Sequence, residues 1–423
     1  MENTESLKKE LSSCVKCGAC QSACPVFLQL KREHGVARGK FALIQSLIDG
    51  EIEVTERFAE VMSQCVLCLS CKETCAAKIE VEQLIPFARH EVLKNRGIPF
   101  KKKIALSILS SKETQKKIIF SLLRILDPLF LKKITESSGL YYRFSFFLER
   151  GRFIPGLVRK PFSDRYRQPL QGDTKKPKVF FFPGCMINFV YPNIGESAVG
   201  ILKKMNCTII FPKEKNCCGF PAFASGDIIT SKELAEANLN GFLKTQFDAI
   251  VVACATCGTA FKKIYDYHFK NQNNEKFSRW NEIKKKIFDI SEFIIEFGKQ
   301  DLSRKLPISG NQQRVTYHDP CHLKKSQGIY LQPREIIANI AGLNFTEMEE
   351  ASSCCGFGGT FSLENYRLSL EINDIKSERV ISSNSSKVLT SCPGCIMQLQ
   401  GGLLRHGSKI KVSHWIEEVA GLF

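Results

Sequence analysis

The sequence predicts an α+β multidomain fold with a helical N-terminal domain, a helical linker and two similar α/β lobes. Three observations predict it. Two runs of four closely spaced cysteines lie near the N-terminus, a basic stretch follows them, and one cysteine pattern then occurs twice in the C-terminal half. A chain of 423 residues is also longer than one hydrophobic core usually supports, which favours several domains. We place the domains at 1–90, 91–175, 176–300 and 311–423.

The cysteine content favours metal binding over disulfides. Apolar residues make up 43% of the chain and charged residues 24%, as in ordinary globular proteins. The N-terminus lacks the pattern of a signal peptide, and no apolar run is long enough to cross a bilayer. We therefore expect a cytoplasmic location, with peripheral attachment to the inner face of the membrane as an option. Because the cytosol keeps thiols reduced, nineteen cysteines are better explained as metal ligands.

The two N-terminal cysteine runs have the spacing of cubane iron–sulfur ligands. Each run follows C-x2-C-x2-C-x3-C, in which three cysteines ligate one 4Fe–4S cluster and the fourth ligates the other. The predicted ligands are Cys14, Cys17, Cys20 and Cys75 for one cluster, and Cys65, Cys68, Cys71 and Cys24 for the second. Zinc is the alternative, but zinc sites prefer C-x2-C pairs separated by a longer loop. The arrangement resembles a bacterial two-cluster ferredoxin domain. Apolar spacing between Gly39 and Gly50 predicts a helix that separates the runs.

The predicted linker carries most of the excess positive charge. Residues 91–180 contain 21 Lys or Arg against 7 Asp or Glu, and their apolar positions recur at helical spacing, as in 118–126. No recognised nucleic-acid module is present, so nucleic-acid binding is not expected. We expect the basic helices to contact an acidic partner subunit or a membrane surface. A solvated helical face is the alternative.

The C-terminal half contains an internal duplication of cysteines. The first copy has Cys185, Cys217, Cys218, Cys254 and Cys257, and the second has Cys321, Cys354, Cys355, Cys392 and Cys395. Matching cysteines lie 136 to 138 residues apart. Strand-like segments at 178–182 and 314–318 precede the first cysteine of each copy, and helical segments alternate with the strands. Each copy is therefore predicted to form one parallel α/β lobe, with its cysteines at strand ends, where ligands gather.

Adjacent cysteines and two histidines are the candidates for chemistry in the lobes. An adjacent pair can place two thiolates on neighbouring metals. The glycine that follows each pair, Gly219 or Gly356, lets the backbone turn or approach a cluster closely. His318 and His322 bracket Cys321, so they could hydrogen-bond a cluster sulfur or deliver a proton to a leaving thiolate. The alternative is that they cap or orient a turn.

These motifs resemble the cysteine-rich family named for its CCG motif. That family includes the catalytic subunits of heterodisulfide reductases and the iron–sulfur subunits of glycolate and D-lactate oxidising complexes. The resemblance covers nearly the whole chain, in the order of two-cluster ferredoxin domain, helical linker and two CCG lobes. It implies that the five cysteines of a lobe hold a further, non-cubane 4Fe–4S cluster, giving one or two such clusters in the chain. Glycolate-oxidase subunits often lack one cysteine of the final C-x2-C, whereas both sets are complete here.

The resemblance implies an iron–sulfur subunit of a flavin-dependent 2-hydroxy-acid oxidase or dehydrogenase. Such a subunit passes electrons from a partner flavoprotein, which oxidises glycolate or D-lactate, to a quinone or another carrier. The sequence has neither the glycine-rich turn of a dinucleotide site nor a phosphate loop. The FAD is therefore expected on the partner subunit only.

Two rival hypotheses stay open at the level of the sequence. One is a heterodisulfide-reductase-like enzyme that cleaves a disulfide at the second CCG site, with Cys354 and Cys355 as catalytic residues beside His318 and His322. The complete cysteine sets favour it. The other is a scaffold or assembly protein whose C-terminal sites hold zinc.

Overall fold

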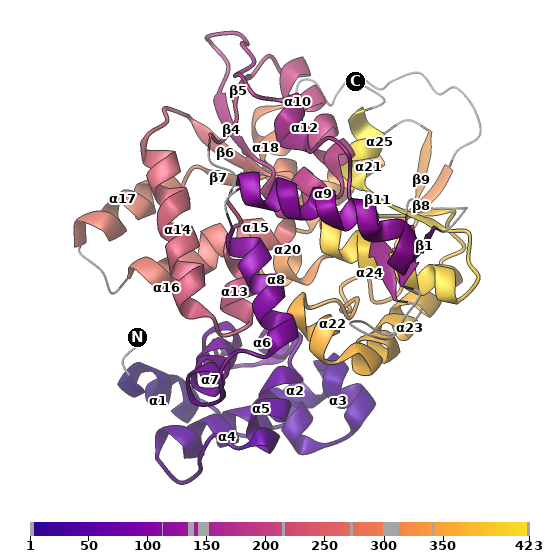
Figure 1. Ribbon diagram of the computed structural model, residues 1–423. Coiled ribbons are helices and arrows are strands. Elements are labelled where there is room, and N and C mark those ends of the chain that lie inside the picture. The colour runs from indigo at the N-terminus through magenta and orange to yellow at the C-terminus, as the bar shows by residue number, and fades with distance from the viewer. Residues whose placement is uncertain are drawn as a thin grey trace.

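The computed structural model describes most of the chain. The described residues are 4–111, 113–133, 139–142, 152–213, 216–270, 274–298, 313–340 and 342–420. Figure 1 shows the N-terminal domain at one end of the molecule and the two lobes side by side beyond it. None of the described helices has both the length and the apolar character that a bilayer crossing requires.

The N-terminal domain consists of short helices. They are α1 (Thr4–Ser12), α2 (Ala19–Ala23), α3 (Pro25–Leu30), a 3-10 turn (Glu33–Gly35), α4 (Ala37–Ile48), α5 (Glu56–Ser63), α6 (Ser70–Thr74) and α7 (Val81–Arg96). Helix α4 confirms the helix predicted between the cysteine runs, and it buries Phe41 and Ile44. Thr55 caps α5, because its hydroxyl accepts a 3.1 Å hydrogen bond from the Phe58 N–H.

The first lobe is built on a four-stranded parallel sheet. Its strands are β4 (Lys178–Phe182), β5 (Thr208–Ile210), β6 (Ala249–Val252) and β7 (Ile287–Asp289), in the order β5-β4-β6-β7. Its helices are α11 (Gly184–Phe189), α12 (Pro192–Lys204), α13 (Phe220–Ala224), α14 (Ile228–Leu243), α15 (Ala255–Thr259), α16 (Tyr265–Phe269), α17 (Asn274–Lys284) and α18 (Ile290–Phe297), with a π-helical turn over Ala260–Ile264. Strands β4 and β6 are almost completely buried, as expected for a parallel sheet with both faces covered.

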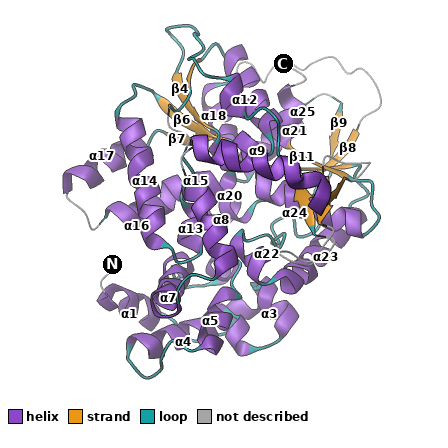
Figure 2. Ribbon diagram, in the orientation of Figure 1, coloured by secondary structure: helices purple, strands orange, loops and turns teal. Residues whose placement is uncertain are grey.

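The second lobe repeats this topology, which confirms the predicted duplication at the level of the fold. Its strands are β8 (Gln313–Tyr317), β9 (Leu343–Phe345), β10 (Lys387–Thr390) and β11 (Lys411–His414), in the order β9-β8-β10-β11. The described helices of this lobe are α20 (Cys321–Gln327), α21 (Leu331–Ala338), α22 (Thr360–Glu364), α23 (Tyr366–Ser382), α24 (Pro393–Arg405) and α25 (Trp415–Ala420). All strand pairs in both sheets are parallel, and Figure 2 shows helices around both.

The linker is helical at first and then contains strands. Helices α8 (Phe100–Ser110) and α9 (Glu113–Phe130) run in front of the lobes in Figure 1. They are followed by β1 (Leu131–Lys133), β2 (Gly139–Tyr142) and β3 (Phe153–Pro155), and then by α10 (Phe162–Arg165). The three strands form an antiparallel sheet that the helical periodicity of the linker did not predict. Helix α7 runs through position 90, and the proposed domain boundaries stay a prediction.

The N-terminal domain is tied to both lobes. Arg89 on α7 is buried and donates to the carbonyl oxygens of Met62, Ser63, Cys65 and, in the first lobe, Ala224, over 2.6–3.1 Å. Contact with the second lobe is largely apolar, and its buried residues are Val26, Val66, Cys68, Cys354, Phe361, Leu368 and Ile372. The three cysteine-bearing units therefore share continuous packing.

Candidate metal centres

The cysteines of both lobes lie at the carboxyl ends of the central strands. Cys185 follows β4 and Cys254 follows β6, and these two strands are neighbours in the sheet. Cys321 and Cys392 follow the equivalent neighbours β8 and β10. From the two central strands of each sheet, the chain continues to strands on opposite sides, from β4 to β5 and from β6 to β7 in the first lobe. The ends of the central strands therefore form the crevice in which open α/β sheets bind ligands.

Glycine is required after each adjacent cysteine pair for two reasons. Gly219 has φ +84° and Gly356 has φ +86°, a left-handed conformation that side chains disfavour. A Cβ atom would also lie 3.1 Å from the carbonyl oxygen of Ser231 on α14, or 2.6 Å from that of Ser369 on α23. The positive φ angles agree with the predicted turn, and the glycines also allow a close approach to a helix backbone; an approach to a cluster stays a prediction.

Gly184 does approach the thiols, which the sequence analysis did not anticipate. Its φ is +68°, and a Cβ atom built there would lie 2.8 Å from Sγ of Cys257. The glycine before Cys185 was the available signal for this contact. Open space next to a buried thiol is what a group bound to that sulfur needs.

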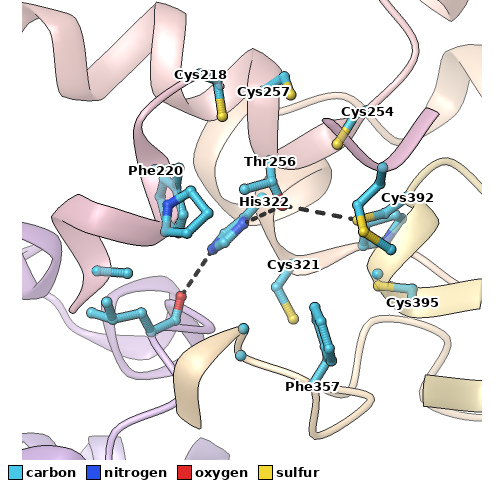
Figure 3. A pocket seen from close by; sticks show the side chains of 18 of the residues that line it. Cys218, Phe220, Cys254, Thr256, Cys257, Cys321, His322, Phe357, Cys392 and Cys395 are labelled. Atoms are coloured by element: carbon cyan, nitrogen blue, oxygen red, sulfur yellow. Dashed lines mark hydrogen bonds between the residues drawn. The ribbon is translucent and has the colours of Figure 1, made fainter. Parts of the chain in front are cut away.

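The cysteines of both lobes line one shared cavity of about 140 Å³. Figure 3 shows Cys218, Cys254 and Cys257 of the first lobe opposite Cys321, Cys392 and Cys395 of the second, with His322 among them. The cysteines that line it are Cys185, Cys218, Cys254 and Cys257 from the first lobe, Cys321, Cys354, Cys355, Cys392 and Cys395 from the second, and Cys68 from the N-terminal domain. Cys217, the remaining member of the two sets, is buried, with 1% of its surface exposed, and is adjacent to Cys218 in the chain.

Thiol-to-thiol contacts continue across the domain boundaries. The Cys254 thiol of the first lobe lowers the pKa of Cys392 in the second lobe well below its usual range. The Cys354 thiol lowers the pKa of Cys68 in the N-terminal domain to about 5. Within the second lobe, Sγ of Cys355 lies 3.6 Å from Sγ of Cys395. The thiols thus form a nearly continuous series from the N-terminal domain to the first lobe.

Two smaller cavities in the N-terminal domain collect its cysteines in two groups. One of about 30 Å³ is lined by Cys24, Cys65, Cys68 and Cys71. The other, of about 50 Å³, is lined by Cys14, Cys17, Cys20 and Cys75, and also by Cys71. The fourth cysteine of each run therefore lies with the first three of the other run, the placement expected for exchanged ligands. That the eight cysteines ligate clusters stays a prediction.

Buried cations surround the thiols, and spacing rules could not have revealed them. Lys40 is 1% exposed and donates 2.8 Å hydrogen bonds to the carbonyl oxygens of His34 and Gly35. Burial alone would lower the pKa of Lys325, but the nearby thiolates of Cys321 and Cys68 raise it overall. Charge is rarely buried unless it is compensated.

These features fit iron–sulfur clusters. None of the nineteen cysteines forms a disulfide, seventeen of them line three cavities, and thiolate sulfur is the donor that such clusters require. Positive charge from Lys40, Arg89 and Lys325 would offset the negative charge of clusters bound there.

The two candidate histidines have different surroundings. Both ring nitrogens of His322 have partners: Nε2 lies 3.2 Å from the Leu67 carbonyl oxygen and Nδ1 lies 3.1 Å from the Thr256 hydroxyl. His322 therefore joins the second lobe to the N-terminal domain and to the first lobe. His318 is completely buried, and neither of its ring nitrogens has a hydrogen-bond partner among the described residues. A catalytic role for either histidine stays a prediction.

Comparisons with known proteins agree with this architecture. A cysteine-rich (CCG) domain model matches residues 179–262 and 315–400, and a 4Fe-4S dicluster domain model matches 10–79. The chain is 30% identical over 413 residues to the probable glycolate oxidase iron-sulfur subunit of Bacillus subtilis, covering 95% of this chain and 91% of that protein.

Two other proteins are similar to this chain in sequence. A subunit of the fumarate reductase (CoM/CoB) of Methanothermobacter marburgensis is 26% identical, with 97% of this chain and 72% of that protein covered. Lactate utilization protein A of Bacillus subtilis is 28% identical, with 57% of this chain and 98% of that protein covered. A crystal structure of a hypothetical protein from Helicobacter pylori has a similar fold, with a TM-score of 0.51 and 13% identity over 99% of this chain and 72% of that chain.

Proposed function

The chain belongs to the CCG family of iron–sulfur oxidoreductases that includes the glycolate oxidase iron–sulfur subunits, and on that premise we propose its role in a complex. It is the electron-transfer subunit of a flavin-dependent 2-hydroxy-acid oxidase or dehydrogenase. A partner flavoprotein, which carries the FAD, oxidises glycolate or D-lactate. Electrons leave the complex for a quinone or another carrier.

The proposed ligands are eighteen cysteines in four groups. The exchanged sets of the N-terminal domain hold two cubane 4Fe–4S clusters, and the five cysteines of each lobe hold a further 4Fe–4S cluster. When bound, such clusters accept and release single electrons. Cys207, the remaining cysteine, is buried at 2% exposure and its Sγ lies 3.9 Å from the Met205 carbonyl oxygen, so it serves as a small core residue.

The observation that carries the proposal is the continuity of the thiol series. Cys68 belongs to an N-terminal group and packs in one buried cluster with Cys354 of the second lobe, and Cys392 of the second lobe lines the same cavity as Cys254 of the first. An electron-transfer subunit needs redox centres that lie next to one another in space. A set of unrelated structural metal sites has no need of such contacts.

The surface end of this series lies at the first cysteine run. Cys17 is exposed, and the neighbouring Val15 is 80% exposed. This is the described cysteine group that a partner can approach most closely, and we assign the exchange of electrons with the partner or carrier to it.

Helices α8 and α9 supply a docking face for the partner or for lipid. Phe100, Ile104, Ile118 and Leu122 are exposed there by 42–70%, within a stretch that carries an excess of positive charge. Apolar side chains among basic ones suit an acidic subunit or an anionic membrane on the cytoplasmic side, where each Lys or Arg contributes about 1 kcal/mol.

Anaerobic purification from the native host, followed by quantification of flavin, iron and zinc, tests the proposal. We expect co-purification of an FAD protein and about sixteen irons per chain, because four 4Fe–4S clusters are proposed. A preparation with about eight irons and two zincs would support the scaffold hypothesis instead.

A disulfide reductase is the second candidate function, since two complete cysteine sets face one cavity. Under this hypothesis, the isolated chain reduces a mixed disulfide when supplied with electrons. Cys354→Ala abolishes that activity, and the absence of a flavoprotein does not. Failure of the isolated, fully loaded chain to reduce any disulfide would leave the electron-transfer role.

A further inference from the structure

The two lobes differ in polarity at one equivalent position next to the thiols. The segments 178–185 and 314–321 align with a constant offset, so that Phe182 corresponds to His318. The sheets confirm the correspondence. Phe182 pairs with Val252 of β6, and the His318 N–H donates to the Leu389 carbonyl oxygen of β10 at 2.9 Å, which continues the β8–β10 pairing by one residue.

The ring nitrogens of His318 lie close to thiols of the second lobe and have no other polar partner among the described residues. A ring nitrogen of His318 and the sulfurs of Cys355 and Cys395 all lie within 4.8 Å of one another. The imidazole is completely buried, and both of its ring nitrogens lack a hydrogen-bond partner among the described residues. A buried donor without an acceptor destabilises the folded state, so a histidine that served only to fill this space would be less favourable than the phenylalanine of the first lobe.

At the equivalent position the first lobe has no such donor. Phe182 packs against Phe261, with ring centroids 4.8 Å apart, and presents no N–H group. His322 cannot act in the same way, because its two ring nitrogens already contact Leu67 and Thr256. Its equivalent in the first lobe is Met186. The two lobes therefore differ at this pair of equivalent positions, where the second lobe has an N–H donor and the first lobe has a phenyl ring.

We propose that His318 donates a hydrogen bond to a thiolate sulfur of Cys355 or Cys395 and so makes the second-lobe site easier to reduce than the first-lobe site. Hydrogen bonds to sulfur stabilise the added negative charge of the reduced state and raise the reduction potential of a cluster. His318 is thus a positioning residue, which acts through a ligand sulfur on the reduction potential of the second-lobe site. One electron that reaches the pair of lobes resides preferentially in the second, and no proton moves.

The location of the second lobe agrees with this assignment. Cys354 of that lobe contacts Cys68 of the N-terminal domain, so electrons that come from the N-terminal domain meet the second-lobe site before the first. The inference rests on the proposed function, since it requires a cluster in each lobe.

The test is an anaerobic redox titration of the full-length, iron-loaded chain, followed by electron paramagnetic resonance. The second-lobe signal is identified as the one lost in Cys395→Ser. In His318→Phe we expect its midpoint potential to fall by about 59 mV or more, a tenfold change in the one-electron equilibrium, with iron content unchanged. His318→Asn, which retains an N–H donor, should recover at least half of the shift.

Two matched variants serve as controls. Phe182→His should raise the potential of the first-lobe signal and narrow the difference between the lobes. His268→Gln replaces a buried histidine that contacts Ser231, and it should leave both potentials unchanged.

Several outcomes would overturn the inference. An unchanged second-lobe potential in His318→Phe at full iron content would show that no such hydrogen bond operates. Selective loss of iron from the second lobe in both His318→Phe and His318→Asn would show that His318 is a ligand or a structural residue. Wild-type protein with iron in the N-terminal domain alone would refute the proposed function itself, and iron quantification distinguishes that case.

Discussion

At the scale of single residues, the glycine that follows each adjacent cysteine pair stands at a position where no side chain fits. Gly219 and Gly356 exclude a side chain, because helices α14 and α23 occupy the space where a Cβ atom would lie. Asn238 and Asn373, on those same helices, donate to the carbonyl oxygens of Cys217 and Cys355 over 2.9–3.0 Å. In each lobe one helix therefore holds the adjacent cysteine pair from behind.

Substitution at the glycine of the second pair should be costly. Gly356→Ala combines a positive φ with a contact of 2.6 Å to the Ser369 carbonyl oxygen. Gly407→Ala is the matched control, because Gly407 has φ +66° but nothing within 4 Å of its Cβ position. The left-handed conformation alone costs about 1–2 kcal/mol. Chemical denaturation should show Gly356→Ala to be the less stable variant by more than about 1 kcal/mol. Equal losses would mean that α23 moves aside without penalty.

His268 should make stability depend on pH below neutrality. Burial lowers its pKa to about 4 from a usual 6.5, with Lys232 lowering it further and Glu236 opposing. Between pH 6.5 and 4 the unfolded chain therefore binds a proton that the folded chain does not. The free energy of unfolding should fall with decreasing pH by up to about 1.4 kcal/mol per unit. Urea denaturation of wild type and His268→Gln between about pH 7 and 5.5 measures the difference, and identical slopes would contradict the prediction.

At the scale of secondary-structure elements, α7 connects the N-terminal domain to the first lobe. Its Arg89 donates to four backbone carbonyl oxygens, one of them from Cys65. Its next residue, His90, lies with Nδ1 3.0 Å from the Gly226 carbonyl oxygen of the first lobe. One helix thus supports a cysteine loop and docks two domains.

Removal of the Arg89 guanidinium should destabilise the docking and the Cys65 loop together. In Arg89→Met, buried carbonyl oxygens lose their donors, each at about 1–3 kcal/mol. We expect a lower midpoint of thermal unfolding and faster release of iron to a chelator. Arg96→Met, on the exposed end of the same helix, should behave like wild type. Equal iron release in the two variants would assign the support of this loop to other contacts.

The exposed face of α8 and α9 should govern attachment to anionic lipid if that face meets a membrane. Ile118→Ser with Leu122→Ser removes two side chains that are 62% and 56% exposed, so the fold should be retained. Sedimentation with vesicles containing anionic lipid should show roughly a fivefold loss of binding or more, and added salt should weaken binding of the wild type. Binding that is unaffected by the double substitution would favour a protein partner for this face.

At the scale of the whole molecule, three cysteine-bearing units meet at one cavity. The lobe interface includes a hydrogen bond from the Ala255 N–H to the Ser391 carbonyl oxygen at 3.2 Å. It also includes His322, which contacts both other units. Thiolates that crowd at such an interface repel one another unless metal binds them.

Removal of iron should therefore loosen the arrangement of the lobes before it unfolds either one. Metal-binding free energy adds to folding free energy when the site forms only in the folded state. Anaerobic chelation should lower the melting temperature by several degrees, and hydrogen exchange should increase first at the amide of Ala255. An increase that is uniform over both sheets would show that the lobes depend on metal individually.

Local patterns in the sequence were sufficient to predict the architecture. The cysteine spacing identified the family and the groups of thiols within each unit. The similar offsets between the two copies predicted two α/β lobes, and apolar periodicity located α4 and α9. Such patterns succeed because strand and helix periods, and the reach of neighbouring ligands around one cluster, are properties of short segments. The strands β1–β3 escaped prediction because their pairing joins segments whose periodicity does not specify a partner.

The tertiary structure decided which groups face one another. The contacts between Cys68 and Cys354 and between Cys254 and Cys392, the burial of Lys40, Arg89 and Lys325, and the position of His318 beside the second-lobe thiols all depend on packing between distant segments. Spacing cannot predict such contacts, because they arise where the surfaces of complete units fit together. The sequence alone therefore determined what kind of centres the chain contains, whereas the packing of three units determined their order and the inequality of the two lobes.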